Sequence, residues 1–341
     1  MPSIGIIGAS GYTGAELLRL CANHSDLDVV YATGDTQAGS RARELYPSLA
    51  GAYADLVFEA LDLDRCAGLD AVFLGLPHEA SMDLVPALLG RVGVVVDLSA
   101  AYRLKDASLY PRWYGFEHAH PELLAEAVYG LPELHRAELK AARLVATPGC
   151  YVTAATLALA PLLRGGLVEA SGIVVDAASG VSGAGRAPKH GNLFCTVDED
   201  FVAYGLLDHR HTPEIEANLG AQVLFTPHLA PMNRGILATC YARPTAAGAA
   251  LTTASAIDEL RRFYDGEPFV VVGDSSPSTK ATLGSNAVHL TARVDERTGW
   301  VMVLAAIDNL AKGASGGAIQ ALNVALGLPE AAGLSTVGIY P

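Results

Sequence analysis

The first half of the chain alternates short apolar runs with amphipathic segments. Runs rich in β-branched residues, "SIGIIGA", "LDVVYAT", "DAVFLGLP" and "VGVVVDLSA", are separated by helix-like segments such as "AELLRLCANH" and "SMDLVPALLG". Strands of a parallel sheet are covered on both faces, so they are apolar throughout, and a helix joins each strand to the next. This pattern predicts an α/β fold with a Rossmann-type, doubly wound parallel sheet.

The pattern changes from about residue 165. Longer runs, "GIVVDAAS", "QVLFTPHL", "GILATCYARP" and "NAVHLTARVD", follow one another with fewer helical segments between them. This half predicts an α+β domain built on a mixed or antiparallel sheet. The tail, from "WVMVLAAIDNL" to "SGGAIQALNVALG", returns to one apolar strand and one helix.

The charge and the cysteine content of the chain exclude several classes of partner and site. The 341 residues include 36 acidic and 23 basic side chains, a net charge of -13, which argues against nucleic acid or an anionic membrane as partner. The five cysteines are far apart and include no C-x-x-C pair, so we expect neither a disulfide framework nor a metal site. With no signal-peptide pattern and no apolar run of about 18 residues, we expect a cytoplasmic protein.

A glycine-rich loop stands between the first apolar run and the first helical segment. In "GIIGASGYTGAELLRL", Gly8, Gly11 and Gly14 are spaced by three residues. Glycines at such a corner let the backbone approach a pyrophosphate at the helix N-terminus, although a loop of packing glycines has the same spacing. We predict a dinucleotide site whose contacts come from Gly8, Ser10, Gly11, Tyr12, Thr13, Gly14, Thr33 and Ser40.

The residues after the second apolar run favour NADP(H). An acid that binds the ribose of NAD would stand near Thr33, which is neutral. Ser40, Arg41 and Arg43 follow closely and suit a 2′-phosphate. Asp35 leaves the opposite choice open, because its charge would repel that phosphate.

A cysteine stands at the corner of "LVATPGCYVTAATLALAPLL". Pro148 and Gly149 enforce a turn, and an apolar helix follows Cys150. A thiol at a helix start feels the positive end of the dipole, which lowers its pKa, and backbone N–H groups there can hold an oxyanion. We interpret Cys150 as a nucleophile, and the other four cysteines as small buried hydrophobes.

Two further motifs supply groups that a thiol nucleophile needs. "DHRHTPEIE" offers His209 and His211 as proton acceptors, in an extended segment just ahead of a helix that Thr212 caps. The pair His118 and His120 in "FEHAHPELL" shows that such a pattern can also be structural. "AASGVSGAGRAPKHG" is a donor-rich loop with two cations, suited to an acyl phosphate or a carboxylate.

With these residues in view, the sequence resembles the N-acetyl-gamma-glutamyl-phosphate reductases, relatives of aspartate-semialdehyde dehydrogenase. The likeness runs along almost the whole chain. It rests on "GASGYTGAELLRL", "GLPHEAS", "VVDLSAAYRL", "VYGLPEL", "ATPGCYVTAATLALAPLL", "SGVSGAGR", "DHRHTPEIE", "FTPHLAPMNRGILAT", "PSTKATLGSN" and "AIDNLAKGASGGAIQALN". The family pattern differs at Thr147, Val152 and Ala101, none of which is a predicted nucleophile or donor.

The resemblance implies NADPH-dependent reduction of an acyl phosphate to an aldehyde, the third step of arginine biosynthesis, by a homo-oligomer. It implies an NADP-binding domain of residues 1–149 with 310–341, and a catalytic, substrate and dimerisation domain of residues 150–309. Cys150 is then the nucleophile, with acid/base chemistry on His209 ahead of His211. Nicotinamide contacts fall near Pro77, Ser182 and Asn309. The substrate contacts expected in matched motifs are Arg103, Ser179, Arg186 and Lys280.

Three alternatives remain at this level. The chain could act on aspartyl phosphate or on an N-blocked aminoadipyl phosphate of lysine biosynthesis. It could also be an NADP-sensing regulator that has kept the fold without the chemistry, a class that would not need Cys150.

Overall fold

The computed structural model describes all 341 residues, which form two compact units. The first unit comprises Met1–Pro148 and Ala314–Leu334, and the second comprises Gly149–Gly313 and Ser335–Pro341. The chain therefore passes from one unit to the other at three points. The last seven residues lie in the second unit.

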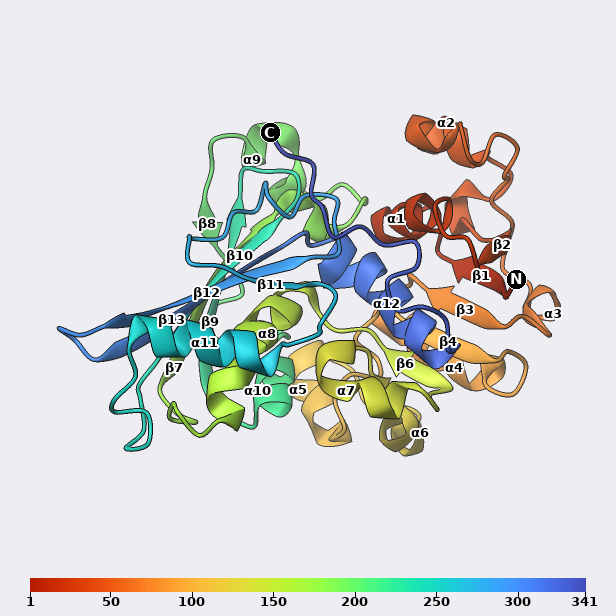
Figure 1. The fold of residues 1–341 in the computed structure, drawn as a ribbon. Coiled ribbons are helices and arrows are strands. Elements are labelled where there is room, and N and C mark those ends of the chain that lie inside the picture. Colours follow the sequence, from red (N-terminus) through yellow and green to blue (C-terminus); the bar gives the residue numbers. More distant parts are fainter. The chain divides into compact units, whose positions relative to one another are not determined.

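The first unit is built on a six-stranded parallel sheet (Figure 1). Its strand order is β2-β1-β3-β4-β6-β5, and every pairing is parallel. The strands are β1 (Ser3–Ile7), β2 (Asp28–Ala32), β3 (Ala71–Leu74), β4 (Val94–Asp97), β5 (Val128–Tyr129) and β6 (Leu144–Ala146). The predicted Rossmann-type sheet is confirmed.

Helices cover both faces of this sheet, as the apolar runs predicted. Ile4 and Ile6 of β1 lie in one core cluster, with helices α1 and α12, whereas Ile7 lies in a second cluster on the other face, with α4. The helices of this unit are α1 (Tyr12–Cys21), α2 (Ala42–Leu45), α3 (Leu63–Cys66), α4 (His78–Leu88), α5 (Tyr110–Tyr114), α6 (Pro121–Glu126), α7 (Pro132–Leu139) and α12 (Gly316–Ala325), with short 3-10 turns η1 (Asp35–Gln37), η2 (Pro47–Leu49) and η3 (Ala107–Leu109).

The second unit is built on a seven-stranded mixed sheet of order β11-β12-β13-β10-β7-β9-β8, also as predicted. Two pairings are parallel, β7 with β9 and β11 with β12, and the others are antiparallel. The strands are β7 (Ile173–Gly180), β8 (Val202–Ala203), β9 (Val223–Ala230), β10 (Ile236–Ala242), β11 (Val270–Val272), β12 (Val288–Asp295) and β13 (Trp300–Ile307).

Helices pack against one face of this second sheet. Along β10, Ile236, Ala238 and Cys240 are fully buried, whereas Leu237 and Tyr241 alternate with them and are only half-buried. The helices are α8 (Cys150–Arg164), α9 (Phe194–Val197), α10 (Thr212–Leu219) and α11 (Thr253–Phe263), with 3-10 turns η4 (Val181–Ala184) and η5 (His190–Asn192) and one π-helical turn η6 (Ala311–Ser315) that runs into the first unit. None of the helices in the chain has the length and hydropathy that a bilayer-spanning segment needs.

Candidate active site

Each of the three glycines of the first loop has a different structural role. Gly8 follows β1 with φ +86°, and a Cβ there would lie 2.5 Å from the carbonyl oxygen of Gly75, so no side chain fits. Gly11 is the N-cap of α1. Gly14 lies so close to Ala9 that a Cβ would come within 2.4 Å of its Cα. The loop thus brings bare backbone to the N-terminus of a ten-residue helix, which suits an anion.

Side chains fix the shape of this loop. The Thr33 hydroxyl accepts the N–H of Gly8 at 3.1 Å, and the Ser10 hydroxyl donates to the carbonyl of Gly34 at 3.1 Å. Ser315 donates to the carbonyl of Thr13 at 2.8 Å. The neutral residue at position 33 therefore holds the glycine loop itself. Pro77 is the N-cap of α4, which follows β3 beside β1.

The loop expected to choose between the two cofactors carries charges of both signs. Asp35 is exposed, with φ +45°. Ser40 is half-buried. Arg41 Nη1 and Asp55 Oδ1 are 3.5 Å apart, and both of these side chains are exposed. Arg43 is half-buried on the short helix α2.

In the second unit, Cys150 is the first residue of the 15-residue helix α8, as predicted, with Gly149 as N-cap. Its side chain is partly exposed. A Cβ added at Gly313 would lie 2.8 Å from the Cys150 Cβ, so the backbone of the π-helical turn packs directly on this side chain. The first N–H groups of α8 have no acceptor four residues back within the helix, and backbone donors of this kind can stabilise an oxyanion.

Three of the other cysteines behave as expected. Cys21, Cys66 and Cys240 are buried, and burial raises the pKa of all three, that of Cys21 to about 12. Cys195 does not, because the short helix α9 leaves it exposed. The prediction that it is buried was wrong.

The two histidines of the HRH element lie in a turn and not in an extended segment. The Nδ1 atom of His209 accepts the N–H of His211 at 3.1 Å, which requires a folded backbone between them. His211 has helical φ and ψ and is itself the N-cap of α10, so the predicted cap at Thr212 was wrong by one residue. The two rings lie 4.8 Å apart, edge to face.

His209 is enclosed by aromatic rings. Its ring lies 5.9 Å from that of Tyr151, 5.5 Å from that of Tyr204 and 5.3 Å from that of Phe225. Burial, with a smaller contribution from the positive charge of Arg210, lowers the pKa of His209 to about 4. An imidazole in this setting is neutral at pH 7, and its Nδ1 is occupied by the turn.

The other histidine pair of the chain makes the same turn. His118 Nδ1 accepts the N–H of His120 at 3.1 Å, just before α6 begins at Pro121. In both motifs the first histidine closes the turn that leads into a helix. The position of His209 thus has a structural explanation that does not apply to His211.

His211 lies against the helix start that carries Cys150. A Cβ on Gly149 would come within 2.5 Å of His211 Nε2, so the imidazole covers the residue next to Cys150. Glu214, three residues further along α10, is fully buried and accepts the N–H of Gly149 at 2.9 Å. The start of α10 thus places the His211 imidazole and the Glu214 carboxylate next to the same residue, Gly149. Sequence reasoning missed Glu214, although its spacing from His211 in "HRHTPE" places both on one helix face.

Two tyrosine hydroxyls were also missed. Tyr151 donates to the carbonyl of His228 at 2.9 Å, and Tyr204 donates to the Tyr151 hydroxyl at 3.2 Å. Burial raises the pKa of both, that of Tyr204 to about 12. They are neutral donors that fix the wall around His209.

The remaining predicted residues fall in both units. In the second unit the structure joins Asn309 and Ser182, whose side chains are buried and hydrogen-bonded at 3.0 Å. Ser179 is buried at the end of β7, next to the turn that holds Ser182. Arg186 is half-buried beyond that turn, and Lys280 is exposed. Arg103 lies in the first unit, where it donates to the carbonyl of Leu98 at 2.9 Å.

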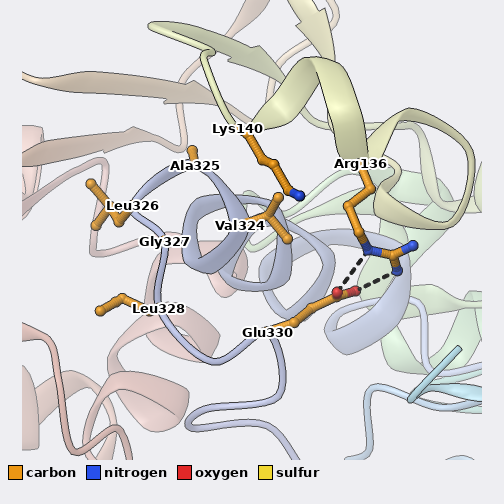
Figure 2. A pocket seen from close by; sticks show the side chains of 8 residues that line it. All are labelled: Arg136, Lys140, Val324, Ala325, Leu326, Gly327, Leu328 and Glu330. Atoms are coloured by element: carbon orange, nitrogen blue, oxygen red, sulfur yellow. Dashed lines mark hydrogen bonds and ion pairs between the residues drawn. The ribbon is translucent and has the colours of Figure 1, made fainter. Parts of the chain in front are cut away.

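A hollow of about 580 Å³ lies elsewhere in the first unit, between α7 and the C-terminal end of α12 (Figure 2). Its wall includes Lys140 and the ion pair of Arg136 with Glu330, whose Nε and Oε2 atoms are 3.0 Å apart. None of the predicted site residues lines it. The bidentate ion pair instead fastens the segment after α12 to α7.

Comparison with known proteins matches both halves of the chain. Residues 3–142 match the family described as "Semialdehyde dehydrogenase, NAD binding domain", and residues 150–309 match "Semialdehyde dehydrogenase, dimerisation domain". The chain belongs to the semialdehyde dehydrogenase family. The predicted membership is therefore confirmed, and with it an enzyme class of oxidoreductases that bind a nicotinamide cofactor.

Three relatives that match nearly the whole chain carry the same name. Proteins called N-acetyl-gamma-glutamyl-phosphate reductase from Citrifermentans bemidjiense and Geobacter sulfurreducens are each 48% identical over 351 residues, covering all of both chains. The protein of that name from Symbiobacterium thermophilum is 48% identical over 99% of both chains.

Two solved structures share the fold of this chain. Aspartate semialdehyde dehydrogenase II of Vibrio cholerae superimposes with a TM-score of 0.70 at 16% identity, over 96% of this chain and 98% of that one. The aspartate semialdehyde dehydrogenase of Candida albicans, solved with NADP, gives a TM-score of 0.69 at 14% identity, over 95% and 98%. At such low identity the likeness establishes the fold alone.

Proposed function

We propose that this chain reduces N-acetyl-gamma-glutamyl phosphate to N-acetyl-L-glutamate 5-semialdehyde and phosphate with NADPH, the third step of arginine biosynthesis. One observation carries the chemistry: Cys150 begins α8, and the His211 ring covers the adjoining Gly149. The substrate follows from the shared name of relatives that are 48% identical over their full length.

The glycine loop fits a dinucleotide. At Gly8 and Gly14 a Cβ would collide with backbone, so backbone N–H groups at the start of α1 can meet a pyrophosphate directly. Ser10, Gly11, Tyr12 and Thr13 would hold it there, with Ser40, Arg41 and Arg43 toward a 2′-phosphate. When bound, NADPH supplies the hydride that converts a thioester to an aldehyde.

The residues of the second unit perform the covalent part of the reaction. His211 accepts the thiol proton of Cys150, and the thiolate attacks the carbonyl carbon of the acyl phosphate. Backbone N–H groups of the first turn of α8 stabilise the oxyanion. The carbon–oxygen bond to phosphate then breaks, His211 passes its proton to the departing phosphate, and an acyl thioester remains on Cys150. When the aldehyde leaves, the carbon–sulfur bond breaks, and His211, which has by then taken up a proton from water, protonates the Cys150 sulfur.

Substrate contacts are proposed for residues of matching charge. Arg103, Arg186 and Lys280 can bind the carboxylate and phosphate groups, and Ser179 can hydrogen-bond the neutral acetamide. No predicted contact offers a carboxylate that would welcome a free ammonium group, which supports an N-acetylated substrate over an aspartyl one.

We also propose a homo-oligomer in the cytoplasm, with residues 150–309 as the catalytic and dimerisation domain. The support for a dimer is the half-buried face of the second sheet, which includes Leu237 and Tyr241, together with the matched dimerisation family. Five free cysteines support a reducing compartment.

The test is hydride transfer in the oxidative direction. Protein, NADP and inorganic phosphate are mixed with N-acetylglutamate semialdehyde, and nicotinamide absorbance is followed. We expect kcat/KM at least about a hundredfold above that for aspartate semialdehyde, because an unmatched charged group is strongly rejected. A reversed ratio would indicate an aspartate-semialdehyde dehydrogenase. Preference for the aminoadipate homologue would indicate a reductase of lysine biosynthesis. No turnover with any of these aldehydes would favour the NADP-sensing regulator.

A further inference from the structure

The second unit contains an ion pair that none of the predicted roles uses. Arg234 lies in the turn between β9 and β10, and Asp308 follows β13 directly. Arg234 Nε and Asp308 Oδ2 are 3.2 Å apart. The Asp308 side chain is fully buried, and that of Arg234 is 17% exposed, so the pair stands at the edge of the interior with the cation outermost.

Asp308 is bonded on every side. Its carboxylate accepts the N–H groups of Gly284 at 2.7 Å, Leu310 at 2.8 Å and Ala311 at 3.0 Å, and its carbonyl accepts that of Gly313 at 3.0 Å. Three backbone N–H groups and one guanidinium thus converge on this single buried carboxylate. Asp308 thus fixes both the turn at 310–313 and the loop around residue 284.

The turn at 310–313 leads to the nucleophile. Gly313 packs on the side chain of Cys150. Asn309, at the start of the turn, accepts the N–H of Gly235 at 2.7 Å and donates to the Ser182 hydroxyl at 3.0 Å. The residue after Arg234 is therefore bonded into the same network that reaches Ser182.

Arg234 is also flanked by the two loops predicted to bind substrate. A Cβ on Gly180, next to Ser179, would lie 2.7 Å from the backbone nitrogen of Arg234. A Cβ on Gly235 would lie 2.7 Å from the Thr279 side chain, which precedes Lys280. The backbone of the arginine is packed between the Ser179 loop and the Lys280 loop.

We propose that Arg234 binds an oxyanion of the substrate, and that Asp308 is the positioning residue that orients its guanidinium. This inference rests on the proposed function and adds to it Arg234 as a cationic residue that binds the substrate. The oxyanion belongs either to the phosphoryl group or to the carboxylate of the acyl phosphate. A guanidinium matches both, because its planar fork donates two parallel hydrogen bonds.

The ion pair itself is a poor means of stabilising the fold. Burying two charges costs about as much as their attraction returns, so well-packed apolar residues would serve as well. A long arginine side chain held through Nε, however, loses less conformational entropy when it binds an anion. The pairing of Asp308 with Arg234 therefore has more value for binding than for stability, whereas the N–H bonds of Asp308 hold the turn and the loop.

The test compares two alkylating reagents at Cys150, in a Cys195→Ser background that removes the exposed thiol. Iodoacetate carries a carboxylate, and iodoacetamide of similar size does not. We expect Arg234→Gln to lower the iodoacetate-to-iodoacetamide rate ratio at least about threefold, as loss of one nearby charge does. Protection of Cys150 is then measured with inorganic phosphate and with N-acetylglutamate. The protectant whose half-protecting concentration rises at least about tenfold identifies the oxyanion.

Two further variants separate binding from folding. Asp308→Asn keeps the charge of Arg234 but not its orientation, so we expect weaker protection by the same anion, and no additional loss in the double variant. Arg234→Lys keeps the positive charge but loses the planar guanidinium with its two parallel donors. It should also weaken the protection of Cys150 by that anion at least about threefold. In turnover, these changes should raise the KM of the substrate more than they lower kcat. Arg262→Gln, an exposed cation on α11, is the matched control and should change nothing.

Unchanged rate ratios and unchanged protection in folded Arg234→Gln would overturn the proposal. If that variant does not fold, unchanged protection in Arg234→Lys would overturn it equally. Alkylation needs no turnover, so its outcome is separate from that of the proposed function. An Arg234-dependent ratio in a protein that does not oxidise N-acetylglutamate semialdehyde would retain the anion site and reject the reductase.

Discussion

The Glu214 carboxylate accepts the backbone N–H of Gly149 at 2.9 Å, one residue before Cys150. The bond runs from the first turn of α10 to the first turn of α8, and Glu214 is fully buried. It holds the corner on which the thiol stands, and it uses the Gly149 amide, which leaves the later amides of α8 to an oxyanion. The buried Glu214 carboxylate thus fixes the backbone next to Cys150.

Glu214→Ala should therefore damage both stability and rate. The Gly149 amide would be left buried without its acceptor, at a cost of about 1 to 3 kcal/mol in the free energy of unfolding. We expect kcat to fall about a hundredfold, because displacement of a reacting group by about 1 Å has effects of that size. Glu214→Gln keeps an acceptor oxygen and should recover most of both losses. Equal damage by both changes, in thermal melts and initial rates, would mean that the charge matters more than the bond.

Replacement of Cys150 by serine should abolish turnover and leave the fold intact. A hydroxyl at this position is a far poorer nucleophile, so we expect a loss of at least about three orders of magnitude in kcat. NADPH binding, followed by fluorescence, should be unchanged. Cys195→Ser is the matched control and should keep full activity, since that exposed thiol lies on α9. Near-normal turnover by Cys150→Ser would exclude a thioester.

His211→Asn should cost more activity than His209→Asn. His211 covers Gly149, whereas the Nδ1 of His209 is occupied by the turn and its ring by aromatic neighbours. We expect His211→Asn to lower kcat about a hundredfold or more and to remove the pH dependence of Cys150 alkylation near neutrality, as loss of a general base does. His209→Asn should retain that dependence. The opposite result would restore the order inferred from the sequence.

His209 should instead make stability depend on pH. Its pKa is about 4 in the folded chain and about 6.5 when unfolded. The unfolded chain therefore binds the proton first, and the free energy of unfolding falls as pH drops from about 6.5 to 4, with no effect of this group above that window. Urea melts between pH 4 and 7.5 should show a shallower decline in His209→Asn than in the native chain. Parallel curves would contradict the buried, neutral assignment.

NADPH should be preferred to NADH through Arg41 and Arg43. Losing one charged contact to the 2′-phosphate costs about 1.5 to 3 kcal/mol, so Arg43→Gln should raise the KM for NADPH at least about tenfold. The KM for NADH should stay within about a factor of two, because NADH lacks that phosphate. Arg41→Gln should act less, since Arg41 already pairs with Asp55. Comparable kcat/KM for the two cofactors in the native chain would instead point to Asp35.

The sequence predicted the architecture because each sheet has its own burial pattern. In β1, apolar residues occupy both faces, and in β10 they alternate with half-buried ones, so a parallel and a mixed sheet could be distinguished from spacing alone. The position of Cys150 at a helix start could be predicted because a Pro-Gly corner, a thiol and an apolar segment are adjacent in the chain.

Contacts between distant residues could not be found in this way. Glu214 meets Gly149 across 65 positions, and Asp308 meets Arg234 across 74. The HRH element misled because spacing alone does not distinguish an extended pair from a turn closed by an imidazole nitrogen. The second pair, His118 and His120, would have been the useful guide, since both precede a helix that has proline in its first turn.

The split of the first unit along the chain also bears on how the protein is made. Helix α12 contributes Ile319 and Leu322 to the same core cluster as Ile4 of β1. During synthesis, β1 leaves the ribosome first, but its core remains open until residues near 334 have emerged. The second unit, apart from its last seven residues, is complete once Gly313 has been added. The unit that begins first therefore closes last, and for most of translation the nascent chain exposes a parallel sheet that still lacks one of its covering helices.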